Sequence, residues 1–160
     1  MSLFRLTIFA PLTLLAGCGF HLQGAFTTPP AMERTYIATS DHRSLFYREL
    51  HATLESAGVQ LVDNPESATA TLAISFDETD QRVLSVSARN VPTEYEVYYT
   101  IEYALDGGTE SLLELQTLTL TRDYTYDSTL VLGKGREEDL LREAIVDDLV
   151  RIVLKQIATL

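Results

Sequence analysis

The side chains that could carry chemistry are few, and their spacing fits no catalytic or metal site. The chain has one cysteine, and its three histidines show no metal-ligand spacing. A phosphate-binding loop would need Gly at 128 and Ser or Thr at 135, where the chain has Ser128 and Gly135. No Gly-x-Ser-x-Gly nucleophile elbow occurs. We therefore predict no catalytic residue and no metal site, and interpret the histidines as surface or tether residues: His21, His42 and His51.

Three acidic residues, Asp77, Glu78 and Asp80, are the remaining candidates for binding a cation. A calcium-binding loop also needs a central glycine and a terminal glutamate at fixed spacing, and both are missing here. The sequence therefore favours a solvated turn at this position.

Cys18 directly follows a segment typical of secretory signals. Arg5 supplies a positive start, residues 6–15 are mostly apolar, and the small residues Ala16 and Gly17 precede the cysteine. A run of about ten apolar residues is too short to span a membrane, which takes roughly 20. Residues 1–17 are therefore predicted to be a signal peptide.

The tetrad Leu15-Ala16-Gly17-Cys18 resembles the lipobox of bacterial lipoproteins. This resemblance implies a diacylglycerol on the Cys18 thiol, cleavage just before Cys18, and acylation of the new amino group. Acylation would remove the thiol as a nucleophile. The alternative is a stray cysteine after a conventional signal. We expect no cofactor other than the covalent N-acyl and S-diacylglycerol lipid at Cys18, which would anchor the domain to a membrane.

Size and charge limit the class of protein further. Removing residues 1–17 from the 160 leaves 143, a normal length for one domain that needs no disulfide or metal. Arg5 is the only charged residue removed, so the net charge of −11 becomes −12. Nucleic-acid binding depends largely on neutralising phosphates, so this acidic balance argues against it.

Hydrophobic periodicity predicts a single domain over residues 35–160, after a lipidated N-terminus and extended tether at residues 18–34. Helical spacing indicates helices at 44–57 and 137–158, and two-residue alternation indicates strands. The segments with strand patterns are 35–39, 68–76, 82–87, 94–105 and 111–124, and 68–76 and 82–87 could belong to one strand. Whether residues 70–87 form one bulged strand or a hairpin stays open. The fold class is α+β, with a four-stranded mixed, largely antiparallel sheet and two helices packed on one face.

The same patterns assign side chains to faces. On the first long strand we expect Leu72, Ile74 and Phe76 to be buried, and Leu140 to belong to the apolar stripe of the last helix. Tyr98 is the candidate for an exposed contact. The core face of the clearest strand is predicted to comprise Tyr95, Val97, Tyr99, Ile101, Tyr103 and Leu105.

The segment Cys18-Gly19-Phe20-His21-Leu22-Gln23-Gly24 resembles the mature N-terminus of the LptE family of lipopolysaccharide (LPS)-assembly lipoproteins. Members open Cys-Gly-Phe-His/Gln-Leu-Arg/Lys-Gly, so Gln23 replaces the usual basic residue. Further matching segments follow in order along the chain: Ala88-Arg89, Glu94-Tyr95-Glu96-Val97, residues 122–127, Val131-Leu132-Gly133-Lys134, and the acidic pair Asp147-Asp148.

The resemblance implies a four-stranded sheet with two helices and a role without catalysis. Family members sit as a plug in the outer-membrane barrel LptD, help it assemble, and assist LPS transport to the cell surface. We therefore expect a one-to-one complex with an LptD-like barrel, on the periplasmic side within or beside its lumen. Gly19 supports outer-membrane sorting, because an inner-membrane retention signal would usually carry Asp there. The alternatives are a lipoprotein hydrolase of envelope polymers and an accessory of another envelope complex.

Direct contact with LPS would require concentrated positive charge on this acidic chain. Arg89 and Lys134 lie in family-matching segments, and Arg82 and Arg136 lie close to them in sequence. These two segments could meet at one end of the sheet, where arginines can bind phosphate in a forked geometry. The predicted LPS-binding residues are Arg82, Arg89, Lys134 and Arg136. That all four are solvated loop charges is the open alternative.

Overall fold

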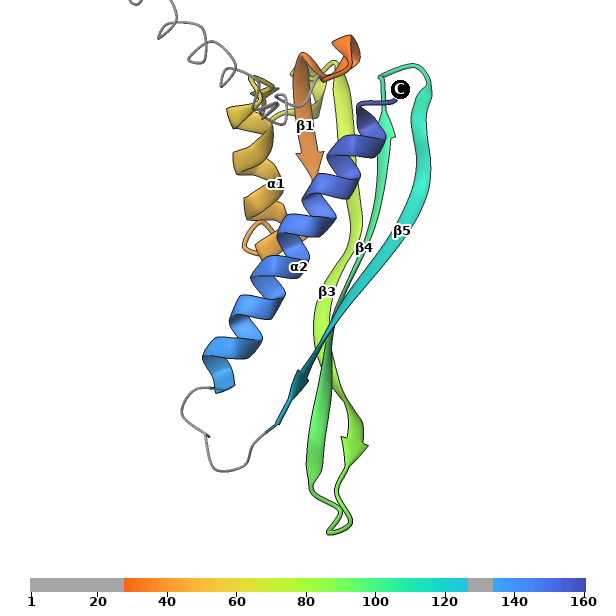
Figure 1. The fold of residues 1–160 in the computed structure, drawn as a ribbon. Coiled ribbons are helices and arrows are strands. Elements are labelled where there is room, and N and C mark those ends of the chain that lie inside the picture. Colours follow the sequence, from red (N-terminus) through yellow and green to blue (C-terminus); the bar gives the residue numbers. More distant parts are fainter. Residues whose placement is uncertain (1–27, 127–133) are drawn as a thin grey trace, which may run out of the picture.

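The computed structural model describes residues 28–126 and 134–160, which form one mixed sheet with two long helices (Figure 1). The strands are β1 (Arg34–Ala38), β2 (Gln60–Leu61), β3 (Ala70–Val86), β4 (Pro92–Asp106) and β5 (Ser111–Thr125). The helices are α1 (Leu45–Ser56) and α2 (Lys134–Ile157), and two short 3-10 turns occupy Pro30–Met32 and Pro65–Ser67. The predicted α+β class is confirmed.

The described sheet has five strands in the order β2-β1-β3-β4-β5, and not the predicted four. The additional strand, β2, pairs only Gln60 and Leu61 with β1, which is too short for any alternation to show in the sequence. β1 runs parallel to β2 and β3, while β3, β4 and β5 form an antiparallel meander. The mixed, largely antiparallel arrangement is as predicted.

The stretch 70–87 is one strand with bulges, which answers the question that the sequence left open. Its register against β4 shifts between Ile74 and Phe76, because Ser75 has no partner in the pairing. An extra residue moves the following side chains to the other face of the sheet. Phe76 consequently pairs with Glu102 on the outer face and is exposed, so its predicted burial is wrong.

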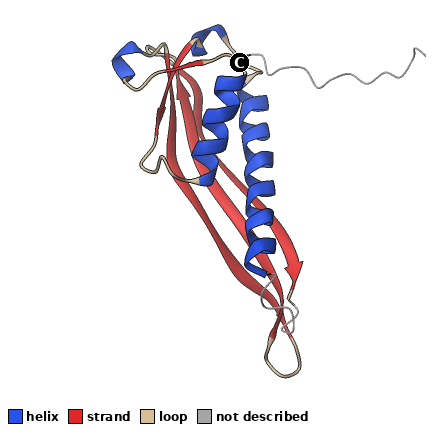
Figure 2. Ribbon diagram, turned by 90° about the vertical axis from the view of Figure 1, so that its left-hand side faces the viewer, coloured by secondary structure: helices blue, strands red, loops and turns tan. Residues whose placement is uncertain are grey.

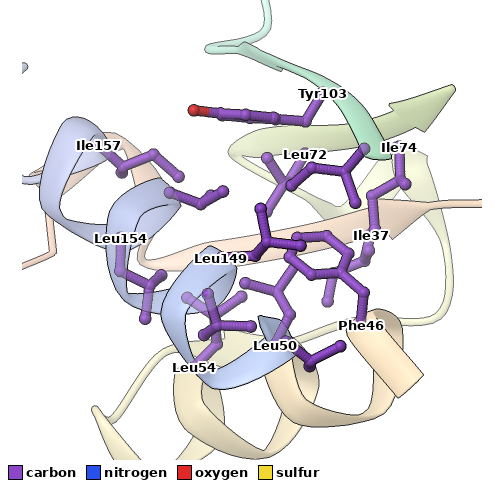
Figure 3. Close-up of a cluster of buried hydrophobic side chains, with 14 of the residues drawn as sticks. Ile37, Phe46, Leu50, Leu54, Leu72, Ile74, Tyr103, Leu149, Leu154 and Ile157 are labelled. Atoms are coloured by element: carbon purple, nitrogen blue, oxygen red, sulfur yellow. The ribbon is translucent and has the colours of Figure 1, made fainter. Parts of the chain in front are cut away.

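Both helices pack on one face of the sheet, as predicted, and the core lies between them and the strands (Figures 1 and 3). Leu149 of α2 and Phe46 of α1 are fully buried and meet strand residues such as Leu72. The predicted tether also contributes, because the 3-10 turn at Pro30–Met32 places Met32 fully inside the core. Leu140, by contrast, is exposed, because the first turns of α2 lie beyond the densest part of the core.

The start of α1 is fastened to the sheet by Asp77, which is not part of a solvated turn. The Ser44 hydroxyl caps α1 by accepting from the Tyr47 N–H (3.0 Å) and donates to the Asp77 carboxylate (2.5 Å). The Tyr99 hydroxyl donates to the other oxygen of Asp77 at 2.6 Å. Burial, followed by the hydrogen bond and charge of Asp77, raises the pKa of Tyr99 well above its ordinary value.

Candidate functional site

The β3–β4 hairpin extends past the start of α2 and ends in a hydrogen-bonded turn (Figures 1 and 2). The Ser87 N–H donates to the Val91 carbonyl at 2.8 Å, and the Asn90 N–H donates to the Ser87 carbonyl at 2.9 Å. Asn90 has a φ of 57°, a left-handed conformation that asparagine tolerates better than most residues. This turn carries Arg89 at the end of the molecule that is farthest from the C-terminus.

Four large apolar side chains of this hairpin are exposed. Between 43% and 53% of the surface of each is accessible: Val83, Leu84, Val86 and Val91. Together with Arg89 we call them the hairpin tip. Single exposed apolar residues are ordinary, but several gathered on one projecting arm indicate a binding surface. An apolar surface with an adjoining guanidinium suits an amphipathic anionic ligand.

Tyrosines support the base of the hairpin tip. The rings of Tyr95 and Tyr124 stack with centroids 5.6 Å apart, and Tyr126 meets Tyr95 edge-on at 5.4 Å. The Tyr124 hydroxyl donates to the Gln81 side chain at 2.9 Å, which ties β5 across to β3. An open recess of about 380 Å³ runs between Tyr126, Arg89 and the turn.

The start of α2 lies near this tyrosine cluster. Burial raises the pKa of the Tyr124 hydroxyl, and the carboxylate of Glu138 in the first turns of α2 raises it further. Farther along the helix, Arg122 of β5 forms an ion pair with Asp148, which also pairs with Arg151. These contacts fix α2 over the meander, so the hairpin tip and the start of α2 occupy the same end of the molecule (Figure 2).

The described residues among the four predicted to bind LPS do not all lie together. Arg89 and Arg136 are exposed at the same end, on the turn and in the first turn of α2. Arg82 lies on the helix-free face, where its guanidinium pairs with the Glu96 carboxylate at 2.5 Å and lies 5.8 Å from the ring centroid of Tyr98. Tyr98 itself is half-buried on that face. The side chain of Lys134, like Cys18, lies outside the described residues.

The sequence did not predict that the apolar side chains of the hairpin tip are exposed. The alternation over residues 82–87 resembles that of any strand with one buried face, and nothing in it reveals that the helices do not reach so far. The adjacent pair Val83-Leu84 carried a signal, since a regular strand would point two neighbouring apolar residues to opposite faces, and only one of them could face a one-sided core. In the structure Leu84 has no partner in the pairing with β4, because the register shifts between Val83 and Ser85.

Within the described ranges, no three His, Cys, Asp or Glu side chains come close enough to hold a metal ion. His42 and His51 flank the ring of Tyr47, at centroid distances of 5.0 and 5.7 Å, and His21 is outside the described residues. Neither described helix combines the length and the apolar character needed to cross a bilayer.

The chain forms an α+β domain that carries an exposed apolar hairpin tip. The family model for lipopolysaccharide assembly, LptE, matches residues 32–157, which is most of the chain. The chain belongs to the LptE family. Its members are non-enzymatic lipoproteins of the cell envelope that take part in LPS assembly, which removes the alternative of a lipoprotein hydrolase.

Curated relatives agree with this assignment. The LPS-assembly lipoprotein LptE of Pectobacterium atrosepticum is 23% identical, over 99% of this chain and 86% of the relative. The LPS-assembly lipoprotein LptE of Yersinia enterocolitica is 22% identical, over 89% of this chain and 69% of the relative.

Solved structures share the fold. An uncharacterized lipoprotein B from Nitrosomonas europaea superposes with a TM-score of 0.72 at 27% identity, covering 88% of this chain and 90% of that one. A rare lipoprotein B from Shewanella oneidensis superposes with a TM-score of 0.68 at 24% identity, covering 79% and 94%.

Proposed function

We propose that this chain is an outer-membrane lipoprotein that binds an LptD-like barrel one-to-one, helps the barrel assemble, and assists LPS transport to the cell surface. The LptE match over residues 32–157 carries the proposal. The exposed hairpin tip supports it, because a domain with a free apolar arm has surface to offer a partner or a lipid. The chain would contact the barrel from the periplasmic side, within or beside its lumen.

Anchoring would come from Cys18. Two acyl chains make membrane attachment stable, so three should make release negligible. Palmitate labelling tests this: wild type should incorporate label and fractionate with the outer membrane, while Cys18→Ala should incorporate none. Label that persists in Cys18→Ala, or wild-type protein in the inner membrane, would contradict the anchor.

The partner is tested by gentle detergent extraction and pull-down of the wild-type chain. An equimolar barrel in the eluate is the expected result. Recovery of the chain alone, under conditions where the barrel is expressed, would overturn the proposed partnership.

LPS would be bound by Arg89 and Lys134, with Arg136 nearby and Arg82 contributing less, because Glu96 already neutralises it. Arg89→Glu combined with Lys134→Glu should weaken LPS binding about tenfold or more, since two attractive charges become repulsive. The matched control is Arg43→Glu with Lys155→Glu, which changes the net charge equally at exposed sites away from the hairpin tip. Equal binding by both double variants, with folding confirmed, would remove the direct-contact role and leave barrel assembly standing.

A further inference from the structure

The two edges of the sheet differ in how well they are closed. At one edge, β2 is only two residues long, and short edge strands offer little for another chain to pair with. At the other edge, β5 has fifteen residues without proline or glycine, and its register against β4 is unbroken from Gln116 to Thr125. Proteins usually protect such an edge with bulges, prolines or charges. The segment from Gln116 to Thr121 has none of these.

In the part of the chain that the structure describes, no strand pairs with the outer edge of β5, and the backbone groups that face this edge follow from the pairing with β4. The Tyr126 N–H donates to the Thr93 carbonyl at 2.7 Å, so the backbone of residue 126 points toward β4. Successive residues of a strand point their backbone groups to opposite sides, and no register shift intervenes down to Gln116. The edge-facing N–H groups therefore belong to five odd-numbered residues: Thr117, Thr119, Thr121, Asp123 and Thr125.

We propose that this edge of β5, residues 116–125, takes up an extended segment of the partner protein by main-chain pairing. Unpaired N–H and C=O groups in strand geometry are complementary to one kind of ligand, another extended backbone. The inference rests on the proposed function, because it takes the LptD-like barrel protein as that partner and names the surface used. Ten residues in continuous register are enough for a full-length strand.

The side chains that border the edge specify the incoming segment. On the α2 side, Leu118 and Leu120 are partly buried and pack against the core. On the helix-free side lie a row of threonines and the Asp123 carboxylate, on a chain of net charge −11. The fitting segment alternates apolar residues toward α2 with polar or basic residues toward the open face. The net charge also disfavours a second copy of this chain at the edge.

Thr119→Pro tests main-chain pairing directly. The proline ring removes one edge-facing N–H and occupies space that a pairing backbone would need. The hydrogen bonds between β5 and β4 are kept, because the backbone groups of residue 119 face away from β4. Thr119→Val is the matched control: both variants lose the side-chain contact to Thr100 (2.9 Å), but valine keeps the N–H. In the pull-down, Thr119→Pro should recover at least about tenfold less barrel, and Thr119→Val an amount within about twofold of wild type.

Hydrogen exchange of wild type gives a second readout that needs no substitution. In the free chain the amides of Thr117, Thr119, Thr121 and Asp123 should exchange fast, while those of Leu118 and Leu120 are protected by β4. In the complex all of them should be protected. This measurement tests main-chain pairing at the β5 edge even if Thr119→Pro fails to fold.

The outcomes separate the two proposals. Equal barrel recovery by wild type and folded Thr119→Pro, or odd-numbered amides that still exchange fast in the complex, overturns edge pairing and leaves the proposed function intact. Wild type that recovers no barrel overturns the proposed function and, with it, the partner named for the edge. A wild-type dimer that Thr119→Pro converts to monomers would show a second copy at the edge and overturn the proposal.

Discussion

The two halves of the β3–β4–β5 meander show the same kind of apolar alternation, but their apolar side chains differ in burial. Beneath the helices, Leu72, Ile101 and Tyr103 are completely buried. In the hairpin tip, Val86 keeps 53% of its surface exposed on a strand that alternates in the same way. The difference lies in what covers the strands, because both helices pack against the end of the sheet that holds the core (Figure 1). The covered half provides stability, and the projecting half stays available for binding.

The largest effect should come from opening a cavity in the covered half. Leu149→Ala removes a fully buried side chain at the centre of the core and should cost about 3 kcal/mol of unfolding free energy. Leu140→Ala, on the exposed part of the same helix, should cost less than about 1 kcal/mol. Urea unfolding of both variants measures this, and equal losses would contradict the division into covered and projecting halves.

The second largest loss of stability should come from removing the Asp77 contact that fastens α1 to the sheet. Asp77→Ala leaves the hydroxyls of Ser44 and Tyr99 without their acceptor and should cost about 2 kcal/mol. Asp80→Ala is the control, since Asp80 lies on the same strand, is exposed, and accepts a hydrogen bond from the neighbouring Gln81 N–H. Thermal melts should place Asp80→Ala close to wild type. Indistinguishable melts for the two variants would show that Asp77 is as dispensable as a surface carboxylate.

Tyr99→Phe should change the pH dependence of stability. The folded chain raises the pKa of Tyr99 above its ordinary value of 10.0, so folding favours the neutral phenol. This contribution is fully present below pH 10 and is lost as the pH rises toward the raised folded value. Phenylalanine should cost about 1 kcal/mol at pH 7 and make the decline of stability above pH 10 shallower. Parallel alkaline profiles for the variant and wild type would contradict this assignment.

The smallest effect on stability is expected at the hairpin tip. Leu84→Ser and Val86→Ser should each change the free energy of unfolding by no more than about 0.5 kcal/mol, because both side chains are already in contact with water. Urea unfolding is again the measurement, with Val97→Ser, fully buried on β4, as the destabilised reference. A loss above about 2 kcal/mol at either site would mean that the tip is structural and not a free binding surface.

The sequence by itself was sufficient for the elements whose signal is local. The helical spacing of residues 44–57 and 137–158 and the alternation of residues 94–105 produced the observed helices and β4 to within a few residues. The pair Gly107-Gly108 is typical of a hairpin turn and lies between β4 and β5, where Gly108 has a φ of 83° that favours glycine. These features depend on neighbouring residues, so periodicity and turn chemistry reveal them.

Only the tertiary structure decided where apolar strand residues are buried. One unpaired residue at Ser75 moved Phe76 to the outer face, and the limited reach of the helices left Val83, Leu84 and Val86 exposed. The Asp77 contact, likewise, joins residues 33 positions apart. Alternation fixes which side chains share a face of a strand, but burial requires a second layer over that face. Which part of a long strand receives that layer depends on how the helices pack, and no local pattern encodes it.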